Sequence, residues 1–175
     1  MSNSITINAF SLSSVVKAKE KLIQKQKRVK DETPKAVEAL TKAGFEYMRS
    51  IAPRSTGNLA DSITWEYDSS KNIGKIHVGA KYAIFVEYGT GIVGASHPHP
   101  EPIPGWTYDV NNHGETGWWY PTDASDTNPT KKQTASGGWI AHTKGQPAHA
   151  FVYQTKEYIK QIAGDELKVS VVGVD

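Results

Sequence analysis

The chain has 175 residues, and a length of this order predicts a single folded domain, 1–175, with room for a hydrophobic core. It has no cysteine, which excludes structural disulfides, thiolate metal sites and cysteine nucleophiles. Twenty Lys and Arg against eighteen Asp and Glu give a formal net charge of +2, too balanced to mark the whole chain as a nucleic-acid binder. The sequence shows neither a signal peptide nor an apolar run of membrane-spanning length, so we expect a protein made in a cytoplasm.

A basic helix is expected to begin at Ser13 or Ser14, with Ser14 as its N-cap. Residues 17–30 hold seven Lys and Arg against one acidic residue. This run is either a solvated helix face or an electrostatic surface for DNA phosphates or an acidic protein ring. Its lysines fall on several faces and it has no aromatic residue, which argues against base readout. The candidate DNA-facing residues are Lys17, Lys21, Lys25 and Arg28.

The next segments predict a helix followed by a hairpin. Pro34, with Thr33 as a cap, either begins a second helix or kinks one long helix. Apolar residues at spacings of three and four from 37 to 51 predict an amphipathic helix. Two alternating segments around a turn at 69–72 predict an antiparallel hairpin over 63–78.

The apolar stretch 81–88 fits either a helical turn or a buried strand, and Gly89-Thr90-Gly91 ends it. Within this stretch Glu87 is a candidate buried or interface carboxylate, which would need a partner. Residues 148–163 predict a last helix, ended by Gly164. Short terminal strands are predicted around Ile5 and Ile7 and between Leu167 and Val174.

Residues 92–146 are rich in Gly, Pro, His and Trp and predict a long loop insertion, with short strands at 118–120 and 138–140 and an exposed loop over 123–137. Aromatic side chains are enriched at the centres of protein interfaces, which favours an interface or a satellite core here over a sugar-binding platform. The candidate interface residues are Trp106, Trp118, Trp119 and Trp139.

The sequence gives little support for metal binding or catalysis. His97, His99 and Glu101 are of the types that bind zinc or nickel, but no third ligand stands at a diagnostic spacing. Glu87, Glu101 and Glu115 stand in no catalytic motif. We therefore expect that the protein is not an enzyme and has no catalytic residue, metal or cofactor. Two alternatives stay open: a metal- or polysaccharide-binding enzyme built on the His/Trp region, and a non-specific DNA-binding module.

Three blocks of sequence, taken in order, resemble one known family. They are residues 52–63 (APRSTGNLADSI), 78–91 (VGAKYAIFVEYGTG) and 145–151 (GQPAHAF). In this order they resemble the tail-completion or head–tail joining (neck) proteins of tailed bacteriophages and prophages. The positions that carry the motif are Gly57, Asn58, Leu59, Tyr82, Ala83, Val86, Glu87, Gly89, Thr90, Gly91, Pro147 and Phe151.

The resemblance implies a structural virion protein that joins the capsid connector to the tail, located in the neck. It implies a ring of copies of this chain, sixfold or twelvefold, beside connector and tail-tube proteins, with non-specific contact to packaged DNA and no membrane. The fold expected from the residues is α+β: long N-terminal helices on a small, mainly antiparallel sheet, closed by a C-terminal helix and strand, with a long Trp/Pro-rich loop insertion.

Overall fold

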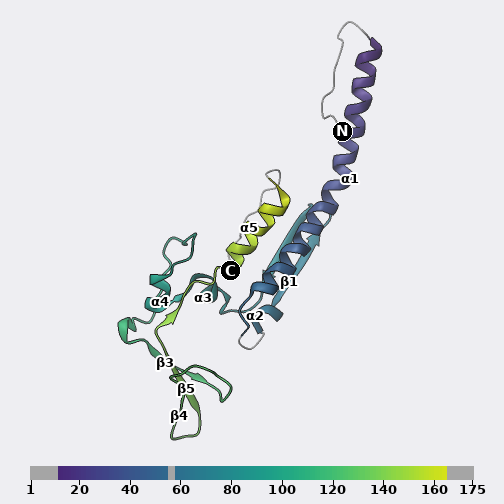
Figure 1. The fold of residues 1–175 in the computed structure, drawn as a ribbon. Helices are drawn as coiled ribbons and strands as arrows, with labels where there is room; N and C mark the ends of the chain where they lie inside the picture. The colour runs from purple at the N-terminus through teal and green to yellow at the C-terminus, as the bar shows by residue number, and fades with distance from the viewer. Residues whose placement is uncertain (1–11, 55–57, 165–175) are drawn as a thin grey trace.

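The computed structural model describes residues 12–54 and 58–164, and it confirms the predicted α+β class. The chain is elongated: the N-terminal part of helix α1 (Leu12–Ile51) extends beyond the body at one end, and a small β-sheet lies at the other (Figure 1). Between these ends, α1 packs against a β-hairpin and helix α5 (Phe151–Ala163). The predicted strands around Ile5, Ile7 and Leu167–Val174 lie outside the described residues, as does Gly57.

Helix α1 is one element of 40 residues with Pro34 inside it, so the alternative of a second helix beginning at Pro34 is wrong. Thr33 is not a cap: its hydroxyl donates to the Val29 carbonyl one turn earlier, at 2.7 Å. Ser14 is likewise inside the helix, which begins at Leu12. An interior proline removes one helix hydrogen bond. We infer that α1 tolerates this loss because the residues that follow are held by tertiary packing.

The predicted hairpin is confirmed. Strands β1 (Ile63–Asp68) and β2 (Ile73–Val78) pair antiparallel, with Ile63 opposite Val78 and Asp68 opposite Ile73. A short helix, α2 (Asn58–Asp61), leads into β1. The hydrophobic core lies between the inner half of α1, this hairpin and α5, and its most buried large side chain is Phe151, at 0% exposure.

The ambiguous stretch 81–88 is helical: it forms α3 (Ala83–Tyr88), which is followed by α4 (Gly91–Ser96). Ala83 and Glu87, which are four residues apart, are the buried positions of α3, as expected for one face of a helix. α5 begins at Phe151, three residues later than predicted, because Ala150 adopts a left-handed conformation with φ +53°. It ends before Gly164, as predicted.

Residues 92–146 contain more regular structure than the expected loop. After the 3-10 turn η1 (Gly114–Thr116), strands β3 (Trp118–Thr122), β4 (Lys132–Gln133) and β5 (Trp139–Thr143) form a three-stranded antiparallel sheet in the order β3-β5-β4. The two short strands predicted around Trp118 and Trp139 are confirmed. The short strand β6 (Gly145–Gln146) then returns the chain to the body.

Candidate functional site

Glu87 is the centre of a buried polar cluster. Its side chain is only 7% exposed, yet the carboxylate accepts three hydrogen bonds. His99 Nε2 donates to Oε1 at 2.8 Å, the backbone N–H of Tyr153 donates to Oε1 at 2.9 Å, and that of Val152 donates to Oε2 at 2.8 Å. The sequence predicted that Glu87 needs a partner, and the structure supplies three donors from two distant segments.

The contact to Val152 and Tyr153 caps helix α5 from another part of the chain. The first N–H groups of any helix lack partners within it, and a carboxylate there also meets the positive end of the helix dipole. The N-cap of α5 is Ala150, which makes no side-chain cap bond. Glu87, which belongs to α3, caps α5 instead. Two further backbone bonds join the same segments, from His149 N to the Val86 carbonyl at 2.9 Å and from Ala150 N to the Glu87 carbonyl at 3.1 Å.

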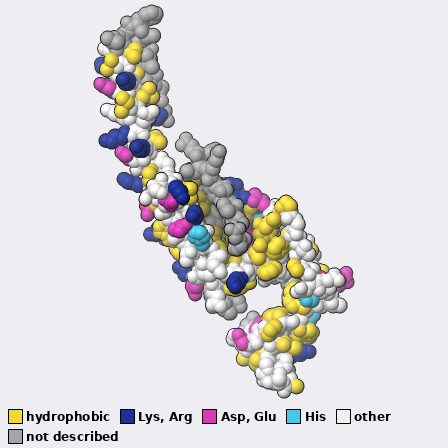
Figure 2. All heavy atoms as spheres, turned by 180° about the vertical axis from the view of Figure 1, so that it is seen from behind, with side chains coloured by type: hydrophobic (Ala, Val, Ile, Leu, Met, Phe, Trp, Pro, Cys, Tyr) yellow, Lys and Arg dark blue, Asp and Glu magenta, His cyan; other side chains and the backbone are white. Residues whose placement is uncertain are grey.

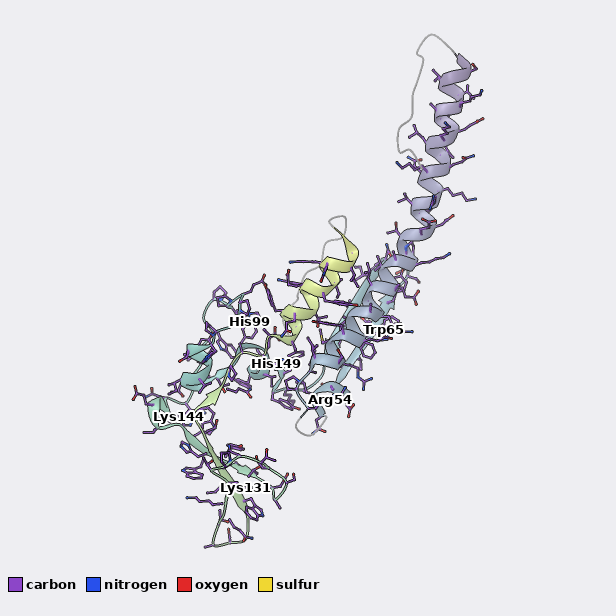
Figure 3. All side chains as sticks on the ribbon, viewed as in Figure 1. Arg54, Trp65, His99, Lys131, Lys144 and His149 are labelled. Atoms are coloured by element: carbon purple, nitrogen blue, oxygen red, sulfur yellow. The ribbon has the colours of Figure 1, made fainter. Side chains whose placement is uncertain are left out.

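His99 connects this cluster to the start of the insertion. It is 4% exposed, and Figure 3 places it beside the beginning of α5. Since Nε2 donates to Glu87, Nδ1 can either accept from the Glu101 N–H at 2.9 Å or, once protonated, donate to the Glu101 carbonyl at 2.7 Å. The imidazole packs on Tyr88, with ring centroids 4.4 Å apart. Burial raises the pKa of the Tyr88 hydroxyl, and the negative charges of Glu87 and Glu101 add to that effect.

The suggested metal site does not form around these histidines. His97 is exposed, and its Nδ1 contacts the Val93 carbonyl at 3.2 Å, whereas His99 is engaged with Glu87 and Glu101. Glu101 turns to Lys156 in an ion pair that lowers the pKa of its carboxyl group. Within the described residues, no group of three His, Asp or Glu side chains is placed to hold a metal ion. His97, His99 and Glu101 are therefore each engaged in contacts other than a shared metal site.

The Gly-Thr-Gly motif closes the base of the insertion. Thr90 pairs with Gln146 and Gly91 with Gly145 in an antiparallel bridge. Gly89 has φ +79°, and a Cβ there would stand 2.7 Å from the Ala148 nitrogen. A side chain at this position would be both strained and in collision with backbone, so the motif requires glycine. The two ends of the insertion are thus fixed side by side.

The structure divides the four candidate interface tryptophans into two groups. Trp106 packs on the body, with its ring centroid 5.8 Å from that of Phe85 and 5.2 Å from that of Tyr88. Its buried Nε1 meets no acceptor among the described residues. The other three, Trp118, Trp119 and Trp139, lie on the insertion sheet. Trp106 therefore belongs to a satellite core, as one of the two favoured alternatives predicted.

Trp119 carries the exposed aromatic surface of the insertion. It is 48% exposed, with Lys132 Nζ 4.0 Å from its ring centroid and His142 in edge contact at 5.0 Å. Alternation along the strands places Trp119, His142 and Lys132 on one face of the sheet, away from Trp118 and Trp139. We call the face formed by Trp119, Pro121, Lys132, Ile140 and His142 the Trp119 face. Figure 3 shows its sheet, near the labelled Lys131, at the far end from α1.

The four candidate DNA-facing residues, Lys17, Lys21, Lys25 and Arg28, all lie on the outer half of α1, which we define as residues 15–32. Every side chain from 19 to 32 is exposed. The same segment exposes five large aliphatic side chains, between 42% and 57%: Val15, Val16, Leu22, Ile23 and Val29. Figure 2 shows Lys and Arg side chains interspersed with hydrophobic ones along this segment. The family-motif residues lie outside this outer half of α1.

Most of the family-motif positions meet at one junction. Leu59 of α2, Ala83 and Val86 of α3, and Phe151 of α5 belong to the hydrophobic core or pack against it. Glu87, Gly89, Thr90 and Gly91 make the polar and backbone contacts described above. Asn58, Tyr82 and Pro147 are exposed at the edges of these elements. The motif therefore describes a structural junction between three parts of the chain.

A family model matches residues 15–89, which span α1, α2, the hairpin and α3. The family is HK97-gp10_like, described as "Bacteriophage HK97-gp10, putative tail-component". The resemblance to phage tail proteins is confirmed. The match covers less than half of the chain and ends at Gly89, before the insertion and α5. No curated protein and no solved structure matches the chain.

The elements in the matched region form the α1–hairpin packing, whereas the insertion with its Trp119 face lies outside it. Within the described residues, no helix is long and apolar enough to span a membrane. The match supports a phage tail component, which is a structural role.

Proposed function

We propose that this chain is a structural subunit of a phage tail that joins the capsid connector to the tail as part of a ring of its own copies. The family match over residues 15–89 supports the tail assignment. The observation that supports a ring is the presence of two different exposed apolar surfaces at opposite ends of an elongated chain (Figure 1). These surfaces are the Trp119 face and the aliphatic side chains of the outer half of α1.

A ring of identical subunits needs two unlike surfaces on each copy, because each contact is head to tail. Exposed apolar surface of this kind marks an interaction site when it is contiguous. The Trp119 face combines an exposed indole, a side chain of the aromatic type enriched at interfaces, with a lysine and a histidine beside it. In this proposal the insertion contacts the neighbouring copy, and the connector and tail-tube proteins lie above and below the ring.

The direct test removes the insertion sheet and leaves the body intact. Trp118 and Thr143 are paired neighbours in the sheet, so a short Gly/Ser linker can replace residues 118–143 without straining the base of the insertion. A smaller variant, Trp119→Ala with Lys132→Gln, alters only the Trp119 face. Val110→Ser is the matched control, since Val110 is 69% exposed in the insertion but lies outside the sheet.

We expect both insertion variants to fold, judged by circular dichroism, but to leave capsids and tails unjoined in a complementation assay. The Val110→Ser control should support a normal particle yield. Electron microscopy of joined particles should show the chain as a sixfold or twelvefold ring. Normal particle yield from the folded deletion variant would contradict the proposed contact.

A further inference from the structure

The positive charge of the described chain is concentrated on the outer half of α1. Residues 15–32 hold seven Lys and Arg against three Asp and Glu, a net charge of +4. Residues 33–164 hold twelve of each, a net charge of zero. The part of the chain that extends beyond the body is therefore its only strongly charged described element (Figures 1 and 2).

These cations include an ordered row. Because α1 is one uninterrupted helix, the spacings of four, four and three residues place Lys17, Lys21, Lys25 and Arg28 on one side of it. At 1.5 Å per residue the row is about 16 Å long. All four side chains are exposed, and Arg28 also pairs with Glu32 at 3.0 Å, where both partners stay exposed. The row can therefore reach an external ligand without disturbing the fold.

The aliphatic side chains of the same segment form a second line along the helix. Val15, Leu22 and Val29 are seven residues apart, almost two helical turns, so they line up along the axis. At about 100° per residue, Val15 lies about 160° around the helix from Lys17, whereas Val29 lies only about 40° from Lys25, so the stripe begins opposite the row and ends beside it.

We propose that the row formed by Lys17, Lys21, Lys25 and Arg28 binds the phosphate backbone of double-stranded DNA without reading its sequence. A duplex presents a regular line of negative charge, about one per 1.7 Å of axis, which a straight row of cations can follow. An acidic protein would need its carboxylates arranged along a matching line. The segment has no aromatic side chain to stack on a base, so the contact is to phosphates and not to bases.

The test measures fluorescence anisotropy of the full chain with labelled 30-base-pair duplexes of two unrelated sequences. Each phosphate contact contributes roughly −0.9 to the slope of log affinity against log salt, so four contacts predict about −3.6. That slope corresponds to an affinity loss of about 150-fold between 50 and 200 mM salt. The two sequences should bind within twofold of each other.

Two variants with the same loss of charge separate the row from general attraction. Changing all four row residues to Gln should weaken binding at least tenfold and flatten the salt slope. Gln has nearly the helix propensity of Lys and Arg, so the helical circular dichroism signal should be retained. The matched control changes four exposed lysines outside α1, Lys71, Lys81, Lys144 and Lys160, to Gln and should bind like the parent.

Equal weakening by both variants would overturn the proposal, and so would the absence of binding at 50 mM salt. Displacement of the duplex by poly-glutamate at equal charge concentration would assign the row to an acidic protein instead. All these measurements use the isolated chain and no particle. Their failure would therefore leave the proposed ring untouched, and failure of the ring would leave the DNA contact standing.

Discussion

Replacing Glu87 by Gln tests the cluster that holds α3, α5 and the insertion together. The variant keeps the shape of the side chain but exchanges one acceptor oxygen for an NH2 donor. In one orientation the NH2 faces the Val152 N–H; in the other it faces both His99 Nε2 and the Tyr153 N–H. At least one buried donor loses its acceptor in either case.

The magnitude follows from the charge and burial of these bonds. Hydrogen bonds to charged groups contribute about 1.5–3 kcal/mol each, and an orphaned buried donor costs about 1–3 kcal/mol. We expect Glu87→Gln to lower the free energy of unfolding by about 2–4 kcal/mol. For a chain of this size, each kcal/mol shifts the melting temperature by about 2–4 °C, so Tm should fall by roughly 5–15 °C.

Urea and thermal unfolding followed by circular dichroism provide the assay. The control is Glu101→Gln, which removes an exposed carboxylate paired with Lys156 and should change stability much less than Glu87→Gln does. If Glu87→Gln does not fold, His99→Asn offers a milder loss, with an expected fall of about 1–3 kcal/mol. A Glu87→Gln variant within about 0.5 kcal/mol of the parent would refute the role assigned to this carboxylate.

Two further changes test the insertion and its base. Gly89→Ala should lower stability by more than about 2 kcal/mol, because it combines a left-handed φ with a backbone collision. The control is Gly105→Ala, which has φ +83° but open space around it and should cost only about 1 kcal/mol. Thermal melts of the two variants give the comparison, and equal losses would contradict the close approach at Gly89. The second test concerns Asp126, whose carboxyl pKa is lowered by hydrogen bonds from the Thr122 hydroxyl, the Asn128 N–H and the Tyr120 hydroxyl. A lowered pKa stabilises the fold above the ordinary carboxyl value of 3.8 and ceases to do so as pH falls through the depressed value. The melting temperature should therefore drop below about pH 4, and by less in Asp126→Asn; an identical pH profile in the variant would exclude this contribution.

The regular periodic segments could be predicted from the sequence, and the tertiary contacts could not. The hairpin and the inner half of α1 follow from alternation and from three-and-four spacing, because one face of each is buried. At Pro34 the sequence could not decide between a second helix and one long helix, since local proline rules do not include packing further along the helix. Over 81–88 the pattern was too short to separate helix from strand.

The contacts at the junction around Glu87 could be predicted only in part. The sequence indicated that Glu87 needs a partner, but His99 is twelve residues away, and it reaches Glu87 only because α4 and the Gly-Thr-Gly bridge turn the chain back. For the insertion sheet, the sequence predicted β3 and β5 but not β4. Its strands have two to five residues, and side-chain bonds such as Thr122 Oγ1 to Asp126 at 2.5 Å support the turn between them.

Cryo-electron microscopy of the assembled particle tests the central proposal most directly. The account predicts a ring of copies at the junction of connector and tail, with the Trp119 face of each copy covered by the next one. A map that places this chain away from the junction, or that leaves Trp119 facing solvent in every copy, would contradict it.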